Sequence, residues 1–484
     1  MTLRLLTGAR AILFMGPVAI AFFSGGFPAE PRNWAGLVAW LIVALVAAAG
    51  PSPMPRSRGA RLAIAGIVGL AAWTLLSVLW APLAGPAYHD AERVWLYAGA
   101  LIAAAALLRN RAGLRMVEPA VAGGALIVVG YGLSERLAPW LLHFTASHTA
   151  FGRLEQPLTY WNAMGLVAAL GLVIALRLAG DSTRRGLLRI AAAAACAPLG
   201  MGLYVTFSRG ALFAYAAGVV VLVVAAPWHS QLRSIVVGVL ASVAGAIAAA
   251  PFRGVSHLAG SYSSRVTDGT IALVLVAAVA LAAAAAQRRL LVRERSRAGT
   301  HGRLRLPKDA PLIALGVVLM ALAAFVAVGS RERNSVTASA HGASRLTTLE
   351  SNRYQYWKVA TGAFADHPLI GLGASGFAVR WLHDRPFAEG AHDAHSLYVE
   401  TAAELGLVGL ALLACLIVGT VLAARDAHRL ASGLAAGPIA GLVAWAAHAA
   451  VDWDWEMPAA TLPALLLAGV LLALADLRAR FSGA

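Results

Sequence analysis

Residues 159–178 read TYWNAMGLVAALGLVIALRL, a run in which Arg177 is the one charged side chain. About twenty helical residues, each rising about 1.5 Å, cross the hydrocarbon layer of a membrane. Comparable apolar runs recur along the chain. They predict an all-α polytopic membrane protein of about 12–14 transmembrane helices, with fourteen candidate spans near residues 9–25, 34–50, 61–81, 92–108, 116–134, 159–178, 187–206, 210–227, 234–251, 268–288, 310–329, 404–424, 430–450 and 457–476.

The composition supports this class. The 484 residues are 60% hydrophobic and 13% charged, and a soluble chain carries about twice that charged fraction. The net charge of +16 could indicate a nucleic-acid partner. We expect none, because the basic residues lie in short loops between apolar runs, as membrane topology requires. Cys196 and Cys415 both lie inside apolar runs and imply no disulfide framework. The N-terminal run is expected to be the first span rather than a removed signal peptide.

The basic residues also predict an orientation. If the N-terminus is cytoplasmic and the spans alternate, the cytoplasmic segments hold 25 of the 39 Lys and Arg residues. Both termini are then inside, and the longest polar interval lies on the periplasmic or extracellular side. The predicted organisation is helices 1–11 over 1–329, a large extracytoplasmic loop with short helices over 330–404, and helices 12–14 over 405–484.

The polar interval 329–405 is the first candidate for a functional site. It gathers five histidines and six arginines, which are His341, His367, His383, His392, His395, Arg331, Arg333, Arg345, Arg353, Arg380 and Arg385. Residues 347–364 predict a helix in which Arg353 shares a face with Trp357, Ala360 and Phe364. Arg353 could snorkel at the membrane surface or hold an anion with its planar fork. Gly371–Gly376 matches G-x-G-x-x-G but follows no strand, so it predicts a tight turn rather than a dinucleotide site.

His392 and His395 lie three residues apart, at the start of a second predicted helix, on roughly one face. With Asp393 and His383 they could form a metal site, but the usual fixed ligand frameworks are absent and we expect no metal. Either histidine could simply cap the helix or line the head-group zone. The more specific interpretation is a general base at an acceptor hydroxyl.

Three further segments are expected on the same side. Arg209, in Ser208-Arg-Gly210, sits between two spans with almost no loop, where a charge needs a partner or ligand. Residues 153–165 carry Arg153 and place Asn162 at the mouth of a span. Residues 451–458 place Asp452, Asp454 and Glu456 beside Trp453 and Trp455. The tryptophans are typical of a membrane interface. The acids could pair with the outer arginines, or contact sugar hydroxyls while the rings stack on sugars.

The order of these motifs resembles the O-antigen ligase and O-antigen polymerase superfamily of polytopic glycosyltransferases. The similarity rests on Asn162-Ala-Met-Gly165, Ser208-Arg-Gly210, Arg353 with Trp357, the turn from Pro368 to Phe377, and Ala394-His-Ser396 leading to Glu404-Leu-Gly406. It covers about residues 150–460. Ser396 departs from the family's usual His-Asn pair, which leaves His392 as a competitor of His395.

The resemblance implies a GT-C-like fold in the cytoplasmic (inner) membrane and transfer of a glycan from undecaprenyl pyrophosphate to an acceptor hydroxyl on its outer face. It implies no cofactor and no metal. The partners would be the lipid-linked donor, a glycan or lipid acceptor, and membrane lipids. Arg209 and Arg353 would hold the pyrophosphate and His395 would sit at the acceptor. The expected substrate-binding residues are Arg153, Asn162, Tyr354, His392, Asp452 and Asp454.

Two other functions are alternatives. A transporter or flippase of a lipid-linked glycan predicts ionisable residues buried mid-span and inverted halves, and the sequence shows neither pattern. A non-catalytic scaffold does not account for basic groups gathered on one face. Within the enzyme interpretation, ligase and polymerase remain alternatives, because they differ in the acceptor.

Overall fold

A computed structural model of the chain describes residues 2–49, 54–145, 147–296, 302, 304, 306–307, 309–329 and 351–481. These residues form helices and turns, with no strand among them. Part of the polar interval, including His341, Arg331, Arg333 and Arg345, lies outside this description. The long helices are α1 (Thr2–Ala21), α2 (Ala29–Ala49), α3 (Arg58–Leu76), α4 (Ala84–Leu107), α5 (Arg111–Leu137), α6 (Trp161–Gly180), α7 (Gly186–Val205), α8 (Arg209–Ala225), α9 (His229–Ala249), α11 (Tyr262–Ser296), α12 (Ala310–Gly329), α15 (Leu397–Ala449) and α16 (Pro458–Phe481).

The helices confirm an all-α polytopic membrane fold. Within the described residues, ten are long and apolar enough to cross a membrane, and α8 and α12 carry shorter apolar stretches. The helical geometry of α15 breaks at Gly406 and at Ala431, so this element contains both the span predicted at 404–424 and the one predicted at 430–450. α11 is longer than its predicted span and extends to Ser296.

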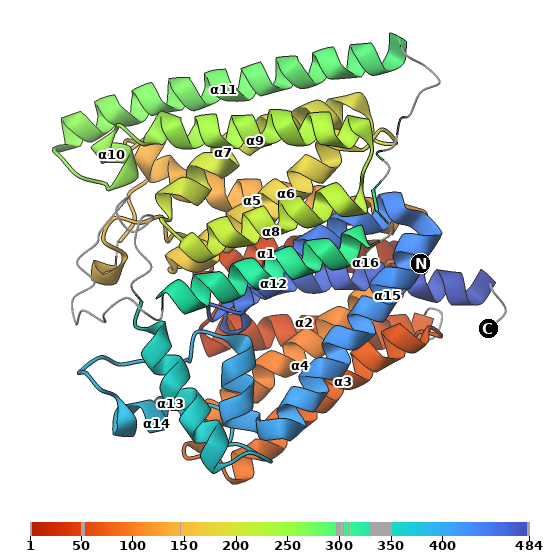
Figure 1. Ribbon diagram of the computed structural model, residues 1–484, viewed down its shortest axis with the longest axis vertical. Helices are drawn as coiled ribbons and strands as arrows, with labels where there is room; N and C mark the ends of the chain where they lie inside the picture. The colour runs from red at the N-terminus through yellow and green to blue at the C-terminus, as the bar shows by residue number, and fades with distance from the viewer. Residues whose placement is uncertain are drawn as a thin grey trace.

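The spans pack in one bundle around α6, whose residues 162–180 are all buried. In Figure 1, α13 (Arg353–Asp366) and α14 (Gly376–Asp384) lie at one end of this bundle, and both chain termini lie at the other. We call these the loop face and the opposite face. The loop face also carries the start of α6, α8 and α16, and the short helix α10 (Arg253–Ser256).

The hydrophobic effect does not drive helices together inside a lipid bilayer, so they associate through close van der Waals packing. Small residues at the interfaces allow this close packing. A Cβ added at Gly66 of α3 would lie 2.4 Å from the backbone nitrogen of Leu416 in α15. One added at Gly419 of α15 would lie 2.3 Å from the nitrogen of Ala63. Glycine at these two positions therefore lets the backbones of α3 and α15 meet.

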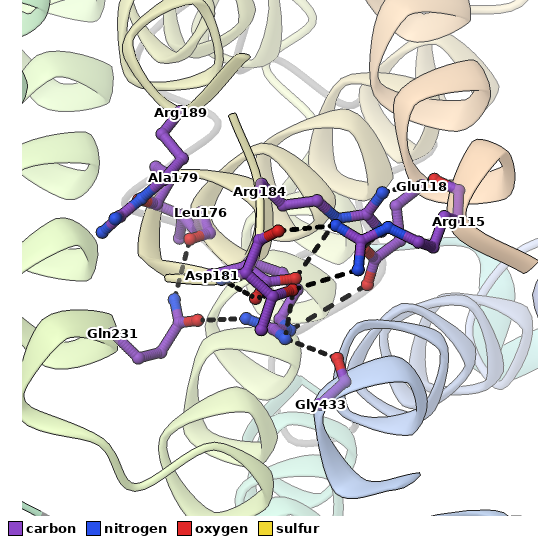
Figure 2. A network of polar contacts seen from close by, with 11 residues as sticks. Arg115, Glu118, Leu176, Ala179, Asp181, Arg184, Arg189, Gln231 and Gly433 are labelled. Carbon is purple, nitrogen blue, oxygen red and sulfur yellow. Dashed lines mark hydrogen bonds and ion pairs between the residues drawn. The ribbon is translucent and has the colours of Figure 1, made fainter. Parts of the chain in front are cut away.

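A buried network of charges ties the helices together at the opposite face (Figure 2). Arg184 donates to Glu118 of α5 at 2.6 Å and to Asp181 at 3.2 Å. Arg177 of α6 lies 3.3 Å from Asp181 and donates to Gln231 of α9 at 2.9 Å. All four charged residues are at least nine-tenths buried. Two acids facing two arginines leave no unbalanced charge in this group, as burial requires.

In the loop, α13 begins at Arg353 and ends at Asp366. Of the helix predicted over 347–364, residues 347–350 lie outside the described chain, and Ser351 and Asn352 precede the helix. The chain turns after Asp366, with Gly371 and Gly373 at positive φ (69° and 88°). Leu372 and Gly373 donate backbone hydrogen bonds to the carbonyls of Ala403 and Glu404. The glycine-rich segment is thus a tight turn, as expected, and it docks the loop on the first turns of α15.

Candidate active site

A cavity of about 530 Å³, lined by both polar and aromatic side chains, opens at the loop face. Five of the predicted site residues lie in its wall, namely Arg209, Arg353, His395, Asn162 and His392. They come from α8, from α13, from the segment before α15, and from the first turn of α6. The other lining residues are Phe27, Thr149, Thr159, Tyr160, Trp161, Phe207, Gly210, Ser351, Asn352, Tyr356, Glu389, Gly390, Ala391, Asp393 and Trp453.

Arg353 is held at the cavity by Asp452. Its Nη2 lies 2.5 Å from Oδ2 of this fully buried carboxylate. Burial would lower the pKa of Arg353, but the charge of Asp452 together with Tyr160 and Asp454 outweighs burial and raises it. Burial would raise the pKa of Asp452, yet Arg353, followed by His448 and His395, keeps it below its usual value. Both groups are therefore ionised at neutral pH.

Tyr160 and Asn162 continue this arrangement. The Tyr160 hydroxyl donates to Oδ1 of Asp452 at 2.7 Å, and Asn162 Nδ2 donates to the Tyr160 oxygen at 2.7 Å. Burial, followed by the Asp452 charge, raises the pKa of Tyr160 well above its usual value, so the phenol keeps its proton. Each carboxylate oxygen of Asp452 therefore has a hydrogen-bond partner. These contacts fix the start of α6 relative to α13.

His395 adopts a left-handed backbone conformation, with φ of 55°. Its Nδ1 lies 3.0 Å from the carbonyl oxygen of Asp393. A carbonyl only accepts, so Nδ1 carries the proton and Nε2 of the neutral ring is an acceptor. Burial of the ring, followed by the charge of Arg353, lowers the pKa of His395 to about 4. The ring packs near those of Tyr356 (centroids 5.2 Å apart) and Trp453 (6.2 Å). His395 is therefore a neutral, oriented imidazole.

Arg209 is the first residue of α8, where Ser208 caps the helix by accepting from the Ala211 N–H at 3.3 Å. The next residue, Gly210, packs on a buried pair. A Cβ at Gly210 would lie 3.2 Å from Nε2 of His448, whose Nδ1 is 2.5 Å from Asp454 Oδ2. Both members of the pair are essentially inaccessible to solvent. The pair supports the end of the helix that brings Arg209 to the cavity.

The three acidic residues of the segment 451–458 each pair with a different basic side chain. Asp452 pairs with Arg353, Asp454 with His448, and Glu456 with Arg93 of α4. All three are at least nine-tenths buried. Asp452 and Glu456 therefore pair with arginines, the first of the two alternatives, whereas the partner of Asp454 is a histidine. Trp453 lies in the cavity wall, whereas Trp455 is buried against Tyr97.

Two other predicted substrate-binding residues stand outside the cavity wall. Arg153 is buried, donates to the carbonyls of Thr149 and Ala150 at 2.7 Å each, and stacks 3.5 Å over the Trp161 ring. It thereby shapes the segment before α6. Tyr354 packs edge-on against Trp357. The buried stripe of α13 keeps the predicted Ala360, but Tyr356 and Ala363 take the places predicted for Trp357 and Phe364. Arg353 precedes Tyr356 by three residues, so it still turns inward.

Tyr160, Arg93 and Glu400 also organise the site, although the sequence motifs do not point to them. Tyr160 lies two residues before Asn162, at a span mouth. The sequence does contain an indication for Arg93, because an arginine at the edge of a predicted span needs a partner. That partner, Glu456, is 363 residues away in the chain. The spacing of apolar residues does not predict a contact between such distant segments.

One group of oxygen ligands could hold a hard cation. Carboxylate oxygens of Asp393, Glu400 and Glu456 lie within 4.8 Å of one another. Arg93 already supplies a positive charge to Glu456, which reduces the need for an ion there. Among the described residues, His392 and His395 do not join this group.

The fold and the cavity define a multi-pass helical membrane protein with an arginine-bearing site at one face. Residues 258–414 match the family described as O-Antigen ligase. This match confirms the resemblance seen in the motifs and supports the O-antigen ligase and polymerase superfamily for this chain. It contains Arg353, His392 and His395, while Arg209, Asn162 and Asp452 lie outside it. A comparison with curated proteins gave no match.

Proposed function

We propose that this protein is a glycosyltransferase that moves a glycan from undecaprenyl pyrophosphate to an acceptor hydroxyl at the outer face of the cytoplasmic membrane. The O-antigen ligase match supports a ligase or polymerase of lipid-linked glycans. The observation that carries the proposal is the convergence of Arg209, Arg353 and His395 on one cavity from three separate segments.

The two arginines suit the leaving group. When the bond from the anomeric carbon to the pyrophosphate oxygen breaks, that oxygen takes the electron pair. Guanidinium groups in a site walled by protein stabilise this charge more strongly than they would in water. A guanidinium has five N–H donors, so the bond to Asp452 uses only part of Arg353. The Asp452 pair also fixes its orientation before the donor binds.

His395 suits the acceptor. Its Nε2 accepts the hydroxyl proton as the acceptor oxygen bonds to the anomeric carbon. A base in this position contributes about 10²–10⁴-fold. Asn162 and Trp453, in the same wall, would contact the glycan. Every step uses side chains of the chain itself, and the leaving group departs without a metal.

The test is transfer in vitro from a synthetic undecaprenyl-pyrophosphate glycan. Arg209→Ala and Arg353→Ala are each expected to lower kcat by about 10²–10³-fold, as loss of a charge-stabilising donor does. His395→Ala should lower it by about 10²–10⁴-fold. Arg380→Ala is the matched control, because Arg380 of α14 pairs at the surface with Asp384 of the same helix and with Asp366 at the end of α13.

Full transfer by the three site variants would refute the assignment of the site. Transfer should also persist in excess chelator, and its loss there would refute the metal-free mechanism. Flipping of the lipid without transfer to any acceptor would instead favour the transporter.

A further inference from the structure

A buried glutamate, Glu400, holds the turn that carries His395 by accepting a hydrogen bond from its backbone. The N–H of Ala394, the residue before it, donates to Oε2 of Glu400 at 2.6 Å. Glu400 lies in the first turn of α15, is nine-tenths buried, and is absent from the cavity wall. It therefore reaches the backbone of the turn but not a substrate.

The anchor acts at a strained point of the chain. A non-glycine residue with positive φ, such as His395, persists only where its surroundings hold it. The helix start supplies one restraint, since Ser396 caps α15 through the Val399 N–H at 3.5 Å. The carbonyl of Asp393 supplies a second by accepting from the His395 ring. The Glu400 bond fixes Ala394, the residue between these two contacts.

Glu400 is itself held in place. Its carboxylate lies in the group with Asp393 and Glu456, and Arg93 bridges Glu456 and Asp90. Burial raises the pKa of Glu456 to about 7 and that of Asp393 well above its usual value. These raised pKa values favour a proton on the group, and a protonated carboxyl can hydrogen-bond to a neighbouring carboxylate instead of repelling it.

We propose that Glu400 is a positioning residue for His395. It fixes the Ala394 backbone so that the imidazole stays in the cavity wall, with Nδ1 on the Asp393 carbonyl and Nε2 open to the acceptor hydroxyl. This role rests on the proposed glycosyl transfer, because it acts only through His395. Glu404 is distinct, since its carboxylate accepts from the Phe377 N–H at 3.0 Å and anchors α14.

The test compares Glu400→Ala with Glu400→Gln. Glutamine keeps an oxygen for the Ala394 N–H and can donate to a neighbouring carboxylate, whereas alanine removes the anchor. Glu400→Ala should lower kcat about tenfold or more with the donor KM within about twofold, as loss of a purely transition-state contribution does. Glu400→Gln should stay within about threefold of wild type, because its acceptor oxygen is retained. Asp366→Ala, an exposed acid on α13, is the control. Unchanged kcat in Glu400→Ala, or an equal loss in Glu400→Gln, would overturn the proposal.

Two further measurements separate positioning from general damage. In a His395→Ala background, Glu400→Ala should cause no additional loss, and a further loss would overturn the proposal. The rate at which diethyl pyrocarbonate modifies His395, followed by peptide mass spectrometry, should change about threefold or more in Glu400→Ala only, since this rate follows the access and protonation of the ring. This readout needs no substrate. If the wild type transfers no glycan, the proposed function fails, while equal modification rates would still overturn the positioning role.

Discussion

At residue 395 the surroundings of a side chain set its chemistry. A histidine in water has a pKa of about 6.5, whereas burial and the nearby Arg353 lower the pKa of His395 to about 4. A base works when unprotonated, so lowering its pKa moves the loss of activity to lower pH. We expect the acid limb of kcat/KM, which reports the free enzyme, near pH 4.

The same measurement on Arg353→Gln should move this limb to higher pH, because Arg353 lowers the His395 pKa. In the wild type, the acid limb of kcat should lie at a higher pH than that of kcat/KM. The reason is that a bound pyrophosphate offsets the charge of Arg353, which lowers the His395 pKa. A limb at the same pH in the wild type and in Arg353→Gln would show that Arg353 does not lower the pKa of the base.

The buried pair of Asp452 and Arg353 leads to a second prediction for a single residue. Asp452→Ala leaves the guanidinium of Arg353 without its partner and removes the acceptor of Tyr160. Breaking one side of a buried pair costs about 3–5 kcal/mol, so Tm in detergent should fall by several degrees. Adding Arg353→Met to Asp452→Ala should recover part of the loss. Additive losses in the double variant would show that the pair is not coupled.

At the scale of elements, the network of Figure 2 joins α5, α6 and α9 through charges at the face opposite the cavity. Glu118→Ala leaves Arg177 and Arg184 facing Asp181 alone. We expect a clear fall in Tm, of the size that breaking a buried pair produces, about 3–5 kcal/mol. The donor KM of the folded protein should stay unchanged, because the network is remote from the cavity.

The control is Asp426→Ala. Asp426 pairs with Arg478, and both side chains are more than one third exposed. A pair of this kind contributes about 0–1 kcal/mol, so Tm should hardly change. Equal effects of the two substitutions would show that burial of the network adds nothing to stability.

At the scale of the whole molecule, the helices alternate between two faces, and the excess of basic residues predicts which face is cytoplasmic. A cysteine at His383, whose side chain is 86% exposed on α14, should react with a membrane-impermeant maleimide in intact cells. Cysteine at Arg289, in the basic stretch that ends α11, should react only after lysis. The reverse pattern would invert the orientation and place the cavity inside.

The class of fold follows from the hydropathy of the chain alone. Apolar runs of about twenty residues leave the backbone no partners in lipid except its own helix, so length and hydropathy suffice to predict spans. Local motifs also pointed to Arg209, Arg353, Asn162, His392 and His395, because polar groups at span ends are few and need a reason to be there.

Which of these polar groups meet depends on how the helices pack. Asp452 holds Arg353 from 99 residues away, and Arg93 finds Glu456 across the bundle. Whether an acid faces a sugar or a buried arginine depends on the rotation and packing of helices, which hydropathy leaves open. The phase of α13 and the anchoring of His395 by Glu400 likewise follow from contacts between segments, and these contacts set the pKa and the orientation on which the proposed chemistry depends.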